Sequence, residues 1–106
     1  MRVLFDQGTP APLRQFLPKH DVAAAYERGW ARLGEFLDAA ETDGFGVLVT
    51  TDLNLKYQQN LGARRIAIVV LSTTSWPRIQ AAVADVVSAI DASAQGSYVE
   101  VLIPWA

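Results

Sequence analysis

The chain has 106 residues, 51% of them hydrophobic, with nine Lys or Arg, eleven Asp or Glu and no Cys. Its length and hydrophobicity predict one domain, residues 1–106, and the formal net charge of −2 argues against nucleic-acid binding driven by bulk charge. The absence of cysteine excludes disulfides and thiolate metal sites, and no segment is apolar over the roughly 20 residues that cross a bilayer, so we expect a cytoplasmic protein with no membrane partner.

The first half of the chain alternates β-prone runs with helical patterns. The expected elements are a strand at 2–5, a helix at 10–17 with Thr9 as its N-cap, a weak strand at 20–25, and a helix at 33–43 that Gly44 ends.

The second half continues the alternation. The expected elements are a strand at 46–51, a short helix at 53–60, a very apolar strand at 66–71, a helix that Ser75, Trp76 and Pro77 open and that runs to Ile90, and an edge strand at 98–103 before Pro104.

Strands that alternate with helices indicate an α/β fold with a parallel sheet. The strands lack polar alternation, which is typical of a sheet covered on both faces. We therefore predict a doubly wound, mainly parallel five-stranded sheet with strand order 2-1-3-4-5. In this order the first and third strands are neighbours, and their carboxyl ends flank the crevice where α/β sheets bind ligands.

Two acids stand at that crevice. Asp6 follows the first strand and Asp52 follows the third. Two carboxylates held so close repel each other. Either a hard cation such as Mg²⁺ or Mn²⁺ neutralises them or one of them stays protonated. The alternative is that Asp6 only begins a turn and Asp52 only caps the helix at 53–60.

Glu35 and Asn54 are weaker candidates for the same site. Glu35 lies in the first turn of the helix after the second strand, which starts from the same edge of the sheet, but a first-turn glutamate is also favoured by the helix dipole. Asn54 could supply a neutral oxygen, although a surface role is favoured. We interpret His20 as structural, without a partner that the sequence identifies, and Trp30, Trp76 and Trp105 as packing or interface residues.

A short basic run without acids spans residues 53–65. It contains Lys56, Arg64 and Arg65, which could hold a phosphate backbone, and Gln58, Gln59 and Asn60, which could contact bases or ribose. For a run of this length a solvated loop is the favoured alternative.

These residues carry a family resemblance. The segments VLFDQGTP, GEFLD, VLVTTDLN and AIVVL resemble the small prokaryotic PIN-like domains, which are related to the PIN nucleases and VapC-type toxins. The resemblance implies a PIN-like three-layer fold and Mg²⁺- or Mn²⁺-dependent cleavage of RNA, with Asp6, Glu35 and Asp52 as catalytic metal ligands. The partners expected on this basis are RNA, an antitoxin protein and a second copy of the chain.

The chain departs from the family pattern at three positions. Gln7, Gly8 and Asn54 stand where an acid, an asparagine and an aspartate are common. Because Gln7 and Asn54 remove negative charge, they also support a second hypothesis, a non-catalytic PIN-like module that binds a partner protein. A third hypothesis is a receiver-like phosphoacceptor with Asp52 and Thr73, but Gln7 and Pro104 stand where receivers carry an acid and a lysine.

Overall fold

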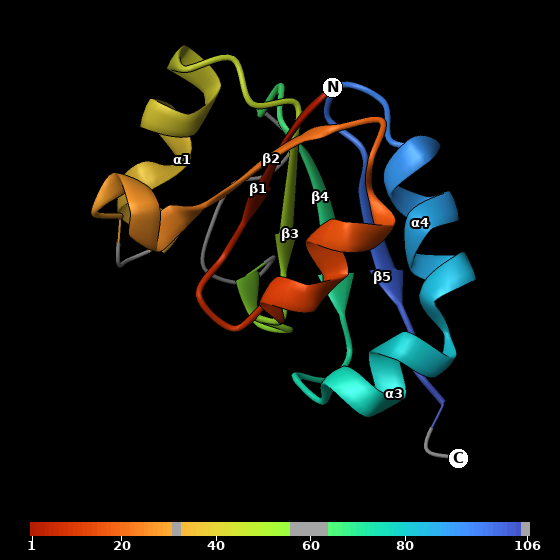
Figure 1. Ribbon diagram of the computed structural model, residues 1–106. Coiled ribbons are helices and arrows are strands. Elements are labelled where there is room, and N and C mark those ends of the chain that lie inside the picture. Colours follow the sequence, from red (N-terminus) through yellow and green to blue (C-terminus); the bar gives the residue numbers. More distant parts are fainter. Residues whose placement is uncertain (31–32, 56–63, 105–106) are drawn as a thin grey trace.

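Five short strands form one parallel sheet in the order β2-β1-β3-β4-β5 in the computed structural model (Figure 1). The strands are β1 (Arg2–Phe5), β2 (Asp21–Ala24), β3 (Val47–Thr50), β4 (Ala67–Leu71) and β5 (Tyr98–Val101). The structure describes residues 1–30, 33–55 and 64–104, without the side chains of residues 33–36. The α/β class, the parallel pairing and the strand order are those predicted from the sequence.

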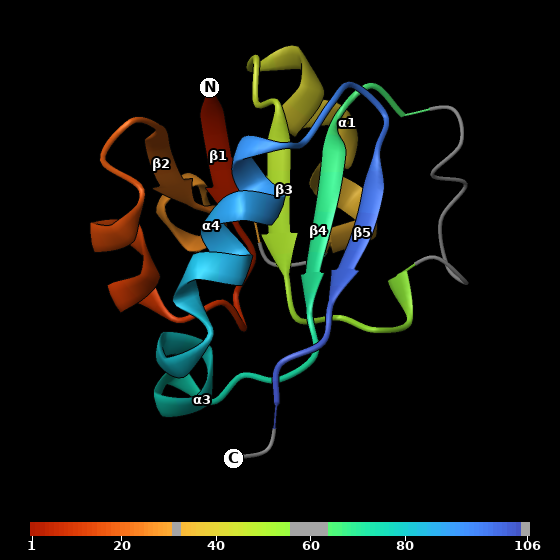
Figure 2. The same ribbon diagram turned by 90° about the vertical axis from the view of Figure 1, so that its right-hand side faces the viewer.

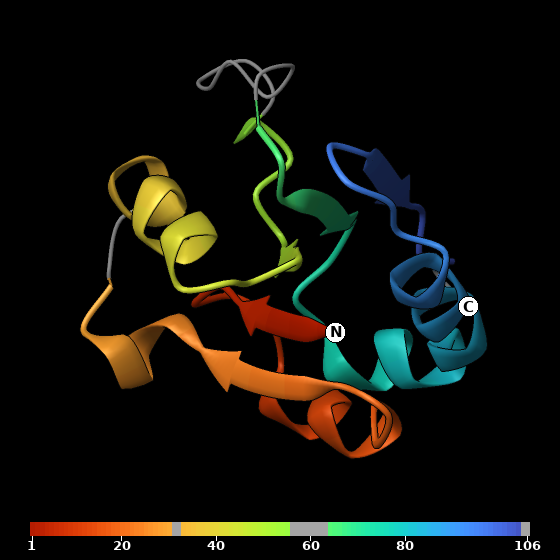
Figure 3. The same ribbon diagram turned by 90° about the horizontal axis from the view of Figure 1, so that it is seen from above.

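Helical segments cover both faces of the sheet and make a three-layer fold (Figures 2 and 3). One face carries η1 (Ala11–Phe16), α3 (Trp76–Ala81) and α4 (Val83–Asp91), and the other carries η2 (Ala25–Arg28) and α1 (Leu33–Thr42). None of the described helices is long and apolar enough to cross a bilayer.

Each strand sends apolar side chains to both faces, which explains the missing polar alternation. In β1, Val3 and Phe5 join the core under η1, α3 and α4, whereas Leu4 joins the core under α1. In β3, Val49 and Leu48 divide in the same way, and all of these side chains are buried. A parallel sheet covered on both faces favours near-continuous apolar runs over polar alternation in its strands.

The helical segments differ from expectation in two places. The segment after Thr9 is a 3₁₀ helix rather than an α-helix, and Thr9 does not cap it, because its Oγ1 donates a hydrogen bond to the carbonyl oxygen of Val49 at 2.9 Å. The helix expected from Trp76 to Ile90 is divided at Ala82, whose φ of −113° and ψ of 22° end α3. The division lets α3 pack beside η1 while α4 follows the sheet (Figure 2).

The remaining helices follow the predictions more closely. Gly44 has a φ of 85° just beyond α1, a conformation that favours glycine and ends a helix. Of the helix expected at 53–60, the structure describes only the turn that leads to Leu55, and residues 56–60 lie outside the described residues.

Candidate metal centre at the carboxyl edge of the sheet

Asp6 and Asp52 both lie at the carboxyl edge, the end of the sheet where the strands finish. β1 and β3 are neighbours, with Phe5 opposite Val49. Asp6 follows β1 directly, and its backbone N–H donates to the Val49 carbonyl oxygen at 2.9 Å. Asp52 is two residues beyond β3. The prediction that the two aspartates follow adjacent parallel strands is therefore confirmed.

Thr50 forms hydrogen bonds with both aspartates, through the carboxylate of Asp6 and the backbone N–H of Asp52. It is the last residue of β3 and is fully buried. Its Oγ1 donates a hydrogen bond to Oδ2 of Asp6 at 2.8 Å and accepts one from the backbone N–H of Asp52 at 3.1 Å. One hydroxyl thus orients the Asp6 carboxylate and fixes the backbone that presents Asp52.

The carboxylates have further partners on their own loops. Oδ1 of Asp6 accepts a hydrogen bond from the backbone N–H of Gln7 at 2.7 Å, and Oδ1 of Asp52 accepts one from the backbone N–H of Asn54 at 3.0 Å. The turn-capping role considered for Asp52 is therefore present. It does not use up the carboxylate, because an ionised carboxylate accepts about four hydrogen bonds or metal contacts.

The acceptor positions left on these two half-buried acids fit a hard divalent cation. Glu35 lies in the first turn of α1, as expected, but its side chain is outside the described part of the structure. Asn54 is exposed in the turn after Asp52. Within the described residues, no three His, Cys, Asp or Glu side chains gather closely enough to hold a metal ion together.

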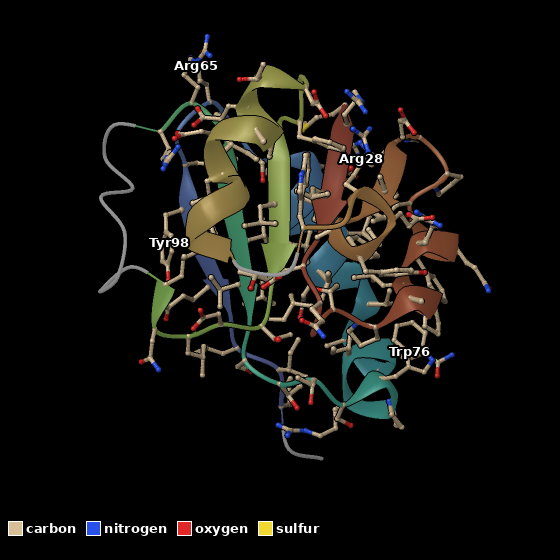
Figure 4. All side chains as sticks on the ribbon, turned by 90° about the vertical axis from the view of Figure 1, so that its left-hand side faces the viewer. Arg28, Arg65, Trp76 and Tyr98 are labelled. Carbon is tan, nitrogen blue, oxygen red and sulfur yellow. The ribbon has the colours of Figure 1, made fainter. Side chains whose placement is uncertain are left out.

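Arg64 and Arg65 lie at the opposite end of the sheet, the amino edge, because they come just before β4; Figure 4 labels Arg65 there. The Arg64 guanidinium pairs with Asp38 and Glu41, and the Arg65 backbone N–H donates to Glu41 at 2.7 Å. The topology therefore places these two arginines away from Asp6 and Asp52, and the phosphate-backbone contact expected of them stays a prediction. Lys56, Gln58, Gln59 and Asn60 lie outside the described residues.

Arg14 lines the cleft beside Asp6 and was not identified from the sequence. Its Nη2 donates to the Val22 carbonyl oxygen at 2.7 Å and to Oε1 of Glu27 at 3.0 Å. A hydrogen bond from the Ala24 backbone N–H and the contact with Arg14 lower the pKa of Glu27, so this glutamate stays ionised and neutralises part of the arginine's charge. A 3₁₀ helix that folds back along the edge strand β2 brings Arg14 here, and no local motif signals it.

Gly8 permits a close approach between the loops that carry the two aspartates. A Cβ at this position would lie 2.3 Å from Oγ1 of Thr51, far inside van der Waals contact. The glycine at this position therefore allows tight packing of the β1 exit loop against the residue after β3.

The other residues singled out from the sequence have structural partners. Nε2 of His20 lies 2.6 Å from Oδ1 of Asp91, a partner that the sequence did not identify and that agrees with the structural role expected for this histidine. Trp76 packs on Phe16 with ring centroids 5.9 Å apart, and Trp30 packs edge-on against Phe45 (Figure 4 labels Trp76). Trp105 is outside the described residues.

Thr73 also has a structural role. Its Oγ1 accepts hydrogen bonds from the backbone N–H of Ser75 at 3.1 Å and from Arg78 at 3.4 Å, at the start of α3. These contacts explain a threonine after β4 without a phosphoacceptor site.

Comparisons of the chain with protein-family models, with curated proteins and with solved structures found no match. The PIN-like resemblance therefore stays a prediction from the residue pattern.

Proposed function

We propose that the protein is a Mg²⁺- or Mn²⁺-dependent ribonuclease whose metal is held by Asp6 and Asp52. The observation that carries the proposal is the Thr50 hydroxyl, which joins the two acids at the crevice between β1 and β3. Ligands of open α/β sheets bind at this crevice, and a buried hydroxyl that orients the Asp6 carboxylate and holds the backbone of Asp52 supports a shared cation between the two acids.

Each residue has a defined part in the proposal. Asp6 and Asp52 hold the metal, with Glu35 from α1 as the third acid and Asn54 as a neutral oxygen donor. The bound ion would supply an ionised water and stabilise charge on the phosphate. Thr50 keeps Asp6 aimed at the crevice, and Arg14 takes the phosphate-binding role first considered for Arg64 and Arg65.

Other parts of the proposal rest on the resemblance alone. They are cytoplasmic action on RNA, an antitoxin protein as a partner, dimer formation, and substrate contacts by Lys56, Gln58, Gln59 and Asn60.

The test combines Mn²⁺ calorimetry with cleavage of single-stranded RNA. We expect Mn²⁺ to bind and to support slow cleavage that EDTA abolishes, and we expect Asp6→Asn and Asp52→Asn to remove both. Asp85→Asn is the matched control, because Asp85 is an exposed acid on α4. Equal Mn²⁺ binding by all of these variants would refute the metal site.

A gain-of-charge variant separates the nuclease from the partner-binding module. Asn54→Asp adds a carboxylate next to the turn that Asp52 caps, so it should strengthen Mn²⁺ binding and speed cleavage. If neither the natural protein nor Asn54→Asp binds Mn²⁺ at millimolar concentration, the nuclease proposal fails and the partner-binding module is favoured.

A further inference from the structure

Two clefts meet at Gln7 and Tyr26, beside the proposed metal site. The first, which we call the acidic cleft, contains Asp6 and Arg14 as well as Gln7 and Tyr26. The second, which we call the aromatic cleft, has a volume of about 230 Å³ and is lined by Gln7, Tyr26, Gly29 and Trp30. Because the clefts share these two lining residues, they adjoin each other at the carboxyl edge, after β1 and β2.

Tyr26 presents a flat ring at this junction. It lies in η2, directly after β2, and is 72% exposed. Gly29, with a φ of 74°, turns the chain after η2, and Trp30 follows it with its ring packed against Phe45. The aromatic cleft thus combines an exposed ring with an anchored one.

Gln7 provides hydrogen-bonding groups between the rings and the acids. It is exposed, and its amide offers both donors and an acceptor. Gln7 directly follows Asp6, and consecutive Cα atoms are only about 3.8 Å apart. A phosphate at Asp6 and a base at Gln7 therefore lie within the reach of one nucleotide.

We infer that the aromatic cleft holds one unpaired base of the substrate strand, stacked on Tyr26 with its edge at Gln7. The inference rests on the proposed function, because it takes the phosphate of that nucleotide to lie at Asp6 and Asp52. The inference also accounts for Gln7. An amide that can contact a base stands here in place of the metal-binding acid that is common in PIN-like domains. Aromatic side chains bind splayed, single-stranded bases in this way, and a base-paired strand could not present its base.

The test measures oligonucleotide binding in EDTA, so that neither metal binding nor cleavage enters the result. The probes are hexaadenylate, hexacytidylate and hexauridylate, with an abasic hexamer that keeps the phosphates. Tyr26→Ala should weaken binding of the tightest homohexamer about tenfold or more, because base stacking contributes strongly to such affinities. Tyr26→Phe keeps the ring and should bind within about twofold of the natural protein.

Two controls accompany these variants. Leu102→Ala removes an exposed apolar side chain beyond β5, at the far side of the sheet, and should leave binding unchanged. The abasic hexamer should bind equally to the natural protein and to Tyr26→Ala.

The outcomes separate this inference from the proposed function. Base-dependent binding that Tyr26→Ala weakens, together with no Mn²⁺ binding, would keep the base site and refute the nuclease. Mn²⁺ binding with homohexamer affinities that Tyr26→Ala leaves unchanged would refute the base site alone. Failure of every homohexamer to bind at millimolar concentration would also refute the base site.

Discussion

The arrangement of the candidate site depends on a single hydroxyl group, that of Thr50. It is buried and serves two partners on two loops. A buried group with both its donor and its acceptor satisfied positions its neighbours more firmly than an exposed one, because water cannot replace it. The positions of both aspartates therefore depend on a residue that is not itself acidic.

Thr50→Val keeps the shape of the side chain and removes both hydrogen bonds. We expect a loss of about 1–3 kcal/mol in the free energy of unfolding, since the Asp52 backbone N–H loses a partner. Mn²⁺ affinity should fall about 10–100-fold, as it does when groups that orient metal ligands are removed. Urea unfolding and calorimetry measure the two effects, with Thr42→Val as the control, because Thr42 is exposed and its hydroxyl donates to the Asp38 carbonyl oxygen within α1.

Asp52 both caps a turn and carries charge, and two substitutions separate these roles. Asp52→Asn retains an acceptor for the Asn54 backbone N–H and removes the repulsion with Asp6, so the melting temperature should stay the same or rise. Asp52→Ala loses the acceptor and should cost about 0.5–2 kcal/mol. Equal destabilisation of both variants, measured by thermal unfolding, would mean that charge rather than capping stabilises this turn.

At the scale of secondary-structure elements, the conformation of the loop after β1 depends on its close packing against the end of β3. The Gly8 backbone packs against Thr51 at a distance that admits no side chain. The Thr9 hydroxyl, bonded to the Val49 carbonyl oxygen, holds the same loop from its other side. The loop is thereby held in place beside Asp6, although it belongs to no regular element.

Gly8→Ala should destabilise the protein by about 1–3 kcal/mol through overpacking against Thr51. Thr51→Ala removes the clashing hydroxyl, so the double variant should recover much of the loss, and a double-mutant cycle measures that coupling. Additive effects of the two substitutions in urea unfolding would contradict the contact.

Several features of these elements could be predicted from the sequence, because they follow from local patterns. Strand positions and their order followed from apolar runs between helices, and the placement of Asp6 and Asp52 after adjacent strands followed from that order. The break at Ala82 and the bond from Thr9 to Val49 have no local signal, because tertiary packing determines both. The position of Arg64 was predictable in principle, since residues that precede a parallel strand lie at its amino end.

At the scale of the whole molecule, a cluster of ionic contacts at the amino edge of the sheet links the end of α1 to the start of β4. Glu41 accepts hydrogen bonds from Arg64 and from the Arg65 backbone, and its side chain is only 11% exposed. Burial alone would raise the pKa of Glu41, but the hydrogen bonds from Arg64 and from the Arg65 and Ile66 backbone outweigh it and lower that pKa.

This lowered pKa predicts acid sensitivity. As pH falls, Glu41 is protonated at a higher pH in the unfolded chain than in the folded protein. The contribution of its ionised carboxylate to the free energy of unfolding is therefore complete above the ordinary pKa of 4.5, and it disappears as pH falls through the lowered pKa of the folded state. Glu41→Gln should reduce the free energy of unfolding at pH 7 by about 1–3 kcal/mol and flatten its decline below pH 4.5.

Urea unfolding at a series of pH values measures this effect. Asp38→Asn is the control, because Asp38 also contacts Arg64 but its side chain is 89% exposed. An unchanged pH profile in Glu41→Gln would show that other acids govern acid unfolding.

The parallel pairing of β1 with β3 also determines when the candidate site can assemble during folding. The hydrogen bond from Thr50 to Asp6 joins residues 44 positions apart, and no hairpin can bring parallel neighbours together early. Contacts so distant in sequence form late in folding, because closing the intervening loop costs conformational entropy. In pulsed hydrogen exchange during refolding, the Asp6 amide bonded to Val49 should therefore gain protection no earlier than the amides of α4.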